Sequence, residues 1–533
     1  MDQINIFVAD DVSESGLEPL KQAGFQLRKQ IGLKGQDLLD AVSQCDGLIV
    51  RSETKVTAEM MDAATRLRVV GRAGVGVDNI DVPAATSRGI VVMNAPDGNT
   101  ITTAEHALAL LIALARNIPQ ANQSLRAGKW ERKKFLGAEL RGKTLGIVGL
   151  GRIGRVVAHH ANAFGMKILA FDPFVAPDQA RDLNIEIASL DEVFANADFL
   201  TVHTPLTSET RGIIGARAFS LMKPGVRVIN CARGGLIDEA ALVSAVKEGR
   251  VAGAAIDVFE QEPPPADHPL LQLEQVIVTP HLGASTKEAQ EGVAVTVAEQ
   301  MRDYLSSGAL RGAVNVPAVG SQELATLNPY LNLAASLGRL QAQIVEDPIR
   351  EVRLEFAGEI ADLDAAPVTR SFVAGLLSGI SARVNAVNAF LIAEERGITI
   401  TTSYLRGSIA TAAPALRTIV ATSQSEQTVA GTLFGRVGGD AEGRITEING
   451  FRLEALPQGH MLLTRNRDIP GVIGKIGAIM GENNVNISRF YLGRHERGGE
   501  AMAVIETDAR VDDDTMNKLK TVAEVVSAKR IQL

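Results

Sequence analysis

A glycine-rich turn between a predicted strand and a predicted helix constrains this chain more than any other feature. The apolar run at residues 144–148 leads into the pattern GxGxxG, formed by Gly149, Gly151 and Gly154, and a helical pattern follows over residues 152–164. Gly149 permits a tight turn, Gly151 lets the backbone approach a pyrophosphate, and Gly154 lets the helix pack closely against the strand. The N-terminus of that helix attracts phosphate charge. The pattern therefore predicts a dinucleotide site in an α/β sheet.

The residues that follow strengthen this prediction and indicate which dinucleotide binds. A second apolar run at residues 167–171 ends at Asp172, about where a dinucleotide fold places the carboxylate that binds the adenosine ribose. Because Pro173 and not an arginine comes next, the sequence favours NAD over NADP. The chain contains 50 glycines, so GxGxxG can also arise by chance, and an ordinary buried βαβ crossover is the alternative.

Length, charge and cysteine content narrow the possible classes of protein. A chain of 533 residues is too long for one core, so we expect several domains. The net charge of -8 gives no electrostatic footprint for nucleic acid or for an anionic membrane. Cys45 and Cys231 fit no disulfide or metal-site spacing, so we expect no bound metal and a reducing, cytoplasmic location. The longest apolar stretch, residues 104–115, contains Glu105 and His106 and does not predict a membrane span.

Alternating apolar and amphipathic segments predict two parallel α/β layers. A turn-rich hinge at residues 94–100 precedes a long helix that ends near Asn117. A helix at residues 285–306 is expected to cross back to the first layer, which would make that domain discontinuous. The strand-like runs of the first layer lie at residues 4–9, 47–50, 68–71 and 89–93, and those of the second at 144–148, 167–171, 199–202, 226–230, 252–256 and 276–278.

The remainder of the chain has a different character. Residues 320–450 are rich in Ala, Gly, Thr and Val, with a predicted helix at 327–344 and β-like runs at 398–405 and 429–437. From residue 459 the predicted elements follow the order βαββαβ, which is typical of a ferredoxin-like unit. Pro470 suits the first turn of the first helix in this unit, and Asp468 is placed to cap that helix.

Three polar side chains follow the last three predicted strands of the second layer. They are Arg233, Glu262 and His281. Because the carboxyl ends of parallel strands meet at one edge of the sheet, we expect these side chains to lie close together. Oxidation of a carbon that bears a hydroxyl needs a base for the hydroxyl proton and a cation for the substrate carboxylate. The set therefore indicates hydride-transfer chemistry, although each residue alone could be a surface cation, a solvated loop acid or a turn residue.

The segment HLGAST at residues 281–286, with the segments 230–235, 148–154 and 72–81, resembles the D-isomer-specific 2-hydroxyacid dehydrogenases. The similarity is greatest to the long members of that family, which act on 3-phospho-D-glycerate and end in an ACT-type regulatory domain. It implies an α/β protein with two Rossmann-like doubly wound domains, an α+β intervening domain and a ferredoxin-like βαββαβ ACT domain. The expected bounds are 1–97 with 286–316 for the substrate-binding domain, 98–285 for the NAD-binding domain, 317–452 for the intervening domain and 459–533 for the ACT domain.

The resemblance also implies a role for each candidate residue. His281, paired with Glu262, would act as acid and base at the substrate C2 oxygen, while Arg233 orients the carboxylate and NAD takes the hydride to give 3-phosphooxypyruvate. The substrate would be held by Arg51, Arg72, Asn99 and, from a neighbouring subunit, Arg132, whose alternative is a solvated basic loop. The implied NAD contacts are Val75 (through its backbone), Gly149, Gly151, Arg152, Ile153, Gly154, Asp172, Thr204, Cys231, Ala232, Arg233, Asp257, His281, Gly283 and Ala284.

For the ACT unit the resemblance implies L-serine as a feedback inhibitor. Asp468 would pair with the ligand ammonium, and Asn486 on the facing strand would add an amide contact. Asn466 stands where some serine-sensitive relatives carry histidine. The whole protein would be a cytoplasmic homotetramer that performs the first step of phosphorylated serine biosynthesis. The alternative is an ACT unit that only dimerises.

Two other functions stay open at this point. One is a different D-2-hydroxyacid dehydrogenase, such as a reductase of glyoxylate or hydroxypyruvate, and the other is an NAD-responsive binding protein. The pair Arg51 and Arg72 argues for a phosphorylated substrate, and the complete catalytic set argues against a binding protein. Of the remaining side chains, Cys231 is not expected to be a nucleophile, His203 could line the NAD site, and packing or surface roles are expected for His106, His159 and His160.

Overall fold

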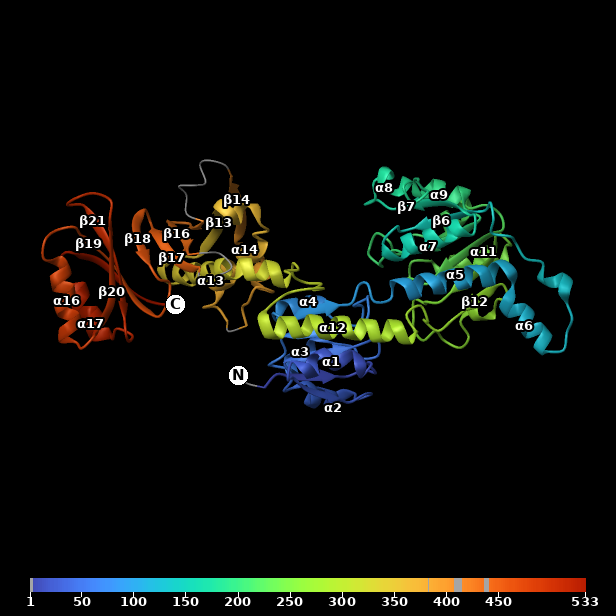
Figure 1. Ribbon diagram of the computed structural model, residues 1–533, viewed down its shortest axis with the longest axis horizontal. Coiled ribbons are helices and arrows are strands. Elements are labelled where there is room, and N and C mark those ends of the chain that lie inside the picture. The colour runs from blue at the N-terminus through green and yellow to red at the C-terminus, as the bar shows by residue number, and fades with distance from the viewer. Residues whose placement is uncertain (1–2, 382, 407–414, 436–440) are drawn as a thin grey trace.

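The computed structural model describes residues 3–381, 383–406, 415–435 and 441–533. They form four sheets, which lie side by side along the long axis of the molecule (Figure 1). Each of these sheets is built from strands of one predicted domain, and a single strand extends past a predicted boundary. The last strand of the third sheet runs to Ala455, beyond the predicted boundary at residue 452, because it pairs with the strand before it.

The first sheet is parallel, with the order β2-β1-β3-β4-β5. Its strand β2 is absent from the sequence prediction because three of its four residues are polar and its side chains alternate in exposure at the sheet edge. The helix α12 (Lys287–Ser307) returns to this sheet, where Met301 fills the space left by Gly47 and Gly71, so the predicted crossing back is confirmed. The strands are β1 (Asn5–Val8), β2 (Gln26–Lys29), β3 (Gly47–Val50), β4 (Val69–Arg72) and β5 (Val91–Asn94), and the helices are α1 (Glu18–Gln22), α2 (Gly35–Val42), α3 (Ala58–Ala63) and α4 (Val82–Ser87).

The second sheet has seven parallel strands in the order β12-β11-β10-β9-β6-β7-β8. The short edge strand β8 (Ile185–Ile187) adds to the six predicted strands. All these strands run in the same direction, but β7 and β8 lie on one side of β6 whereas β9 to β12 follow on the other. Open α/β sheets bind ligands at the point where the strand order reverses in this way. The other strands are β6 (Thr144–Val148), β7 (Lys167–Phe171), β9 (Phe199–Val202), β10 (Val226–Asn230), β11 (Val251–Ile256) and β12 (Val276–Val278).

Helices cover both faces of the second sheet. One face packs against α5 (Thr100–Arg116) and α7 (Arg152–Ala163) through residues such as Leu111 and Val157. The other face is covered by α9 (Leu190–Asn196), α10 (Ala216–Leu221) and α11 (Glu239–Lys247). The remaining helices of this part are α6 (Ile118–Arg126) and α8 (Pro177–Arg181). Both layers of the predicted doubly wound architecture are therefore present.

The third sheet has the order β14-β13-β15-β16-β17-β18, in which only β13 and β14 are parallel to each other. Two neighbouring helices, α13 (Ser321–Ile344) and α14 (Ala366–Leu377), share its core, and α15 (Ala389–Glu395) follows them. The end of the predicted run at 429–437 lies outside the described residues. The strands are β13 (Ile349–Ala357), β14 (Thr399–Leu405), β15 (Leu416–Thr422), β16 (Glu426–Phe434), β17 (Glu442–Ile448) and β18 (Phe451–Ala455).

The fourth sheet is antiparallel in the order β20-β21-β19-β22, which confirms the ferredoxin-like prediction. The predicted cap was wrong, because Gly471, with a φ of 94°, precedes α16, and Asp468 instead pairs with Arg494 at 3.1 Å. The elements are β19 (His460–Arg467), α16 (Val472–Glu482), β20 (Ile487–Arg494), β21 (Glu500–Thr507), α17 (Asp513–Thr521) and β22 (Val525–Gln532).

Within the described residues, no single helix is both long and apolar enough to cross a bilayer. The helices α5 and α6 reach the required length and hydropathy only when joined, and the chain bends by 62° between them.

Candidate active site

The glycine turn has the geometry that its motif requires. Gly149 has a φ of 96°, a conformation that side chains of L-residues rarely adopt. A Cβ on Gly154 would lie 2.2 Å from the carbonyl oxygen of Gly149, so only glycine lets α7 approach β6 this closely. A Cβ on Gly151, at the start of α7, would have no described atom within 4 Å. The turn therefore leaves open space at a helix N-terminus, where a pyrophosphate is favourably bound.

Asp172 lies at the end of β7, next to this turn. One carboxylate oxygen accepts a hydrogen bond from the backbone N–H of Leu150 at 2.8 Å, and the other accepts one from Phe174 at 2.9 Å. The carboxylate is thus fixed beside the turn. Each oxygen keeps a lone pair with which it can accept a ribose hydroxyl.

A cavity of about 500 Å³, here called the turn cavity, opens next to the glycine turn. Several buried polar atoms that line it have no hydrogen-bond partner among the described residues, namely Asn99 Oδ1, Thr100 Oγ1, His203 Nδ1 and Thr204 Oγ1. Burial lowers the pKa of His203 to about 4, so this ring is neutral. Unpaired buried polar atoms are costly, and they fit a polar ligand such as NAD. Of the predicted cofactor contacts, the cavity is lined by Val75, Arg152, Ile153, Thr204, Cys231, Ala232, Arg233, His281, Gly283 and Ala284.

A second cavity, of about 490 Å³, is here called the arginine cavity. It shares Arg233 and His281 with the turn cavity, so the two spaces meet at these side chains. The predicted substrate and catalytic residues that line it are Arg51, Arg72, Asn99, Arg233, Glu262 and His281. Arg132 lies instead in an exposed 3-10 helix at Arg132–Phe135, outside the residues that line the two cavities.

His281 and Glu262 form a hydrogen-bonded pair. His281 Nδ1 lies 2.7 Å from Glu262 Oε2, and the other carboxylate oxygen accepts the N–H of Phe259 at 3.1 Å. Burial raises the pKa of Glu262, but the hydrogen bond and charge of His281 together with the Phe259 N–H outweigh it, so the pKa lies below its ordinary value. An ionised Glu262 fixes the tautomer of His281 with the proton on Nδ1, which leaves Nε2 free to exchange a proton with a ligand.

Three arginines line the arginine cavity, and the loop after β4 packs closely against two of them, Arg72 and Arg233. Burial lowers the pKa of Arg72 to about 10, and the charge of Arg233 acts in the same direction. Arg72 Nε is buried and has no hydrogen-bond partner in the part of the chain that the structure describes. A Cβ on Gly74 would lie 1.9 Å from the Arg72 guanidinium, and one on Gly76 would lie 2.0 Å from that of Arg233. The loop after β4 therefore needs glycines to admit both cations, and a bound anion would stabilise them.

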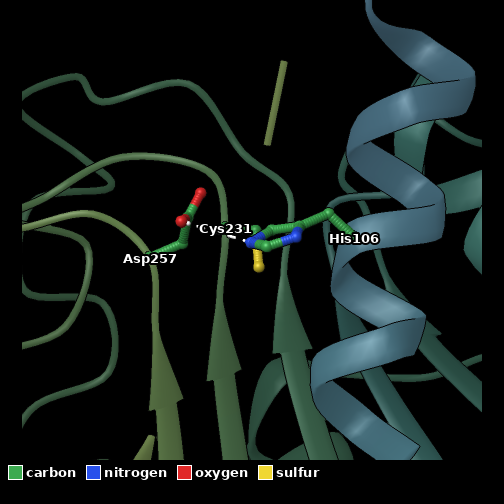
Figure 2. Close-up of side chains that lie close together, drawn as sticks. All are labelled: His106, Cys231 and Asp257. Atoms are coloured by element: carbon green, nitrogen blue, oxygen red, sulfur yellow. Dashed lines mark ion pairs between the residues drawn. The ribbon is translucent and has the colours of Figure 1, made fainter. Parts of the chain in front are cut away.

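Asp257 lies behind the cavity and not in its wall. It is fully buried, and its carboxylate is 3.2 Å from Nε2 of His106 on α5 (Figure 2). Cys231 lies beside them, where burial and the charge of Asp257 raise the pKa of its thiol well above the ordinary value, which is unfavourable for a nucleophile. His106, for which a packing or surface role was expected, is thus paired with a buried carboxylate. A signal was available, because Thr103 and His106 are three residues apart on one helix face.

The predicted regulatory residues of the fourth sheet do not come together within one chain. Asn466 pairs with Ala501 at one end of β21, whereas Asn486 hydrogen-bonds to Asp508 just beyond the other end. Asn466 is buried, and its Oδ1 atom has no hydrogen-bond partner among the described residues. The expected contact of Asn486 with a ligand held at Asp468 is thus not possible within a single copy.

Three segments of the chain match known families. Residues 108–283 match the NAD binding domain of D-isomer specific 2-hydroxyacid dehydrogenases, residues 326–449 match the D-3-phosphoglycerate dehydrogenase intervening domain, and residues 460–524 match the ACT domain. Solved structures support the fold of the first two sheets. A glyoxylate reductase of Paecilomyes thermophila is 31% identical with a TM-score of 0.54, and the match covers 59% of this chain and 99% of that one.

Curated relatives match over nearly the full length. The D-3-phosphoglycerate dehydrogenase of Bacillus subtilis is 43% identical over 531 residues, which cover 99% of each chain. That of Archaeoglobus fulgidus is 41% identical over 533 residues, which cover 99% of this chain and 100% of the relative. The chain therefore belongs to the D-3-phosphoglycerate dehydrogenases, within the D-isomer specific 2-hydroxyacid dehydrogenase family, and it is an NAD-dependent enzyme.

Proposed function

We propose that the enzyme oxidises 3-phospho-D-glycerate to 3-phosphooxypyruvate. The observation that carries this proposal is the junction of the two cavities, where the pair His281–Glu262 faces the same space as Arg233 and Arg72. An acid–base pair beside cations suits a substrate that is a 2-hydroxy acid with a further anionic group. The names of the full-length relatives give the same substrate.

In the proposed reaction, His281 accepts the proton of the C2 hydroxyl through Nε2. Glu262, hydrogen-bonded to Nδ1, stabilises the imidazolium that results. Arg233 binds the carboxylate and stabilises the negative charge that develops on the C2 oxygen. The residues that line the turn cavity would hold NAD, which would supply the acceptor for the hydride from C2. The same groups serve the reverse reaction, in which protonated His281 donates to the carbonyl oxygen of the keto acid.

Arg51 and Arg72 are proposed to bind the substrate phosphate. The Nε atom of Arg72 is buried, and Arg51 directly follows the neighbouring strand β3. Two guanidinium groups give a phosphate several charge-assisted hydrogen bonds. This feature separates the proposal from the reduction of glyoxylate, which has no phosphate.

The test is the initial rate of NADH formation with 3-phospho-D-glycerate at alkaline pH, beside reduction assays with glyoxylate and hydroxypyruvate. We expect the phosphorylated substrate to give the highest kcat/KM by at least about tenfold, which corresponds to about 1.4 kcal/mol of selective binding. Equal or better turnover of glyoxylate would move the function to that of a general 2-hydroxyacid dehydrogenase. Binding of NADH without turnover of any of these substrates would favour the NAD-responsive binding protein.

We also propose that L-serine inhibits the enzyme through the ACT domain and that the protein is a homotetramer. The unpaired buried Oδ1 of Asn466 supports a polar ligand near this strand. Since Asn486 lies beyond the opposite end of β21, it can only complete such a site from a second copy. Sedimentation with and without serine, beside the rate assay, tests both statements. Inhibition that persists in Asn486→Ala, or an ACT domain that only dimerises, would contradict this arrangement.

We further propose that the protein performs the first step of phosphorylated serine biosynthesis, in the cytoplasm. Cys45 and Cys231 are both buried free thiols, which suits a reducing compartment. A strain that lacks this gene should require serine, and growth without serine would contradict the pathway assignment.

A further inference from the structure

We propose that His106 is a positioning residue for hydride transfer, which acts through Asp257 to fix the loop that carries His281. This inference rests on the acid–base chemistry proposed above. His106 lies on α5, whereas the loop follows β12, so the contact joins segments far apart in the sequence (Figures 1 and 2).

Asp257 determines the shape of this loop through both its side chain and its backbone. Oδ1 accepts the hydroxyl of Thr279 at 2.5 Å and the N–H of Leu282 at 2.8 Å, and Oδ2 accepts the N–H of Gly283 at 2.9 Å. The carbonyl oxygen accepts the N–H of His281 at 2.9 Å. One buried residue therefore binds the loop on both sides of His281.

The conformation of His281 makes this support necessary. Its φ is 53°, a left-handed conformation that is uncommon for a residue other than glycine. Surrounding contacts must maintain such a conformation, and residues of this kind concentrate at functional sites. A loop that relaxes would turn the imidazole away from the C2 oxygen.

His106 is the N–H partner that keeps Asp257 in place. Nε2 lies 3.2 Å from Asp257 Oδ1 and 3.4 Å from the Thr279 hydroxyl. Because Asp257 is fully buried, its charge needs every donor that the site provides. Burial raises the pKa of Asp257, but hydrogen bonds from His106, Thr279 and Leu282 outweigh it and keep the carboxyl ionised. Three residues before His106, Thr103 donates to the carbonyl oxygen of Gly283 at 3.1 Å, so α5 contacts the loop twice.

A metal centre is the competing interpretation of the same cluster. Ligand atoms of His106, Cys231 and Asp257 lie within 4.8 Å of one another. However, the Asp257 oxygens already accept four hydrogen bonds from loop and helix donors, and both the burial of the Cys231 thiol and its raised pKa oppose the thiolate that a metal would need. The geometry therefore favours a hydrogen-bonded support for the loop.

The test compares His106→Phe, which keeps the ring volume without the donor, with His106→Gln, which restores an N–H donor near the position of Nε2. We expect His106→Phe to lower kcat by roughly 10- to 100-fold, since small misplacements of a reacting group have effects of that size. KM and the NADH dissociation constant should change less than about twofold, and His106→Gln should recover most of kcat. Thr279→Val should also lower kcat. The double variant of His106→Phe and Thr279→Val should lose less than the two single losses combined, because both donors act on one carboxylate.

The matched control is His160→Phe, since His160 is exposed on α7 and should leave all parameters unchanged. Each variant is assayed with the substrate that the wild-type enzyme turns over best. The wild type therefore tests the proposed substrate, and the variants test the role of His106 separately. An unchanged kcat in His106→Phe, or losses of NADH binding as large as those of kcat, would overturn the positioning role. The positioning role would also be overturned if the wild-type protein contained about one zinc ion per chain and His106→Phe lost it, because that result would show a metal centre. If His106→Phe does not fold, His106→Gln and Thr279→Val carry the same comparison.

Discussion

Asp78 Oδ2 lies 3.2 Å from Arg233 Nε, so the loop after β4 of the first sheet is joined to the loop after β10 of the second. The substrate carboxylate would have to compete with this ion pair for Arg233. The side chain of Asp78 is 66% exposed, so the pair is worth at most about 1 kcal/mol.

Replacing Asp78 by Asn should therefore lower KM for the anionic substrate, by up to about fivefold for 1 kcal/mol. The substitution frees Arg233 and removes a negative charge from the arginine cavity. Steady-state kinetics with saturating NAD measure this, with the NADH dissociation constant as the internal control. A higher KM would mean that Asp78 helps to hold Arg233 in its binding position.

Glu262 leads to a prediction about pH in the direction of keto-acid reduction. Because its pKa is lowered in the folded protein, the carboxylate that stabilises protonated His281 is present above the ordinary glutamate range and is lost only as pH falls through the lowered value. The wild type should therefore keep its reductase activity at acidic pH. Glu262→Gln should reduce kcat by roughly 10- to 100-fold where the wild-type carboxylate is ionised, and the loss should shrink on the acidic side, as the pH falls through the lowered pKa of Glu262 and the wild type loses the same charge. A parallel loss at every pH would show that charge on Glu262 is not what matters.

Two glycines of the turn should respond differently to the same added methyl group. In Gly154→Ala the Cβ would lie 2.2 Å from a backbone oxygen, and overpacking of this kind costs about 1–3 kcal/mol of stability. In Gly151→Ala the Cβ meets no described atom within 4 Å, so the melting temperature should stay unchanged while the affinity for NADH falls. Thermal unfolding and NADH titration of both variants provide the comparison. Equal stabilities would contradict the close approach of helix and strand.

The sequence alone predicts which residues come together when they are close in the chain or follow consecutive strands. Arg233, Glu262 and His281 follow three consecutive strands, and the topology of a parallel sheet brings such positions to one edge. Strand β2 could not be found this way, since a polar edge strand has no apolar run. Its pairing with β1 is decided by backbone hydrogen bonds, which the sequence pattern does not display.

For Asp468 and His106, the sequence did not predict the partner that each side chain has in the structure. Asp468 has the sequence position of a helix cap, but the nearby cation Arg494 on β20 binds it instead. The partner of His106 is Asp257, which is separated from it by most of the second domain. Both contacts depend on a partner that only the folded chain brings near, so local sequence rules could not predict either of them.

The last prediction concerns how the phosphate is recognised. Arg72→Gln should raise KM for 3-phospho-D-glycerate by roughly 10- to 100-fold, since removal of a partner in a charge-assisted hydrogen bond costs about 1.5–3 kcal/mol. Arg51→Gln should have a smaller effect, because its guanidinium already donates to the carbonyl oxygen of Asp11 at 3.2 Å, whereas Arg72 Nε has no partner among the described residues. Neither change should alter KM for an unphosphorylated 2-hydroxy acid by more than about twofold, provided that the carboxylate is bound by Arg233. If Arg72→Gln weakens both substrates equally, Arg72 binds the carboxylate shared by both, and the phosphate site must be sought elsewhere in the arginine cavity.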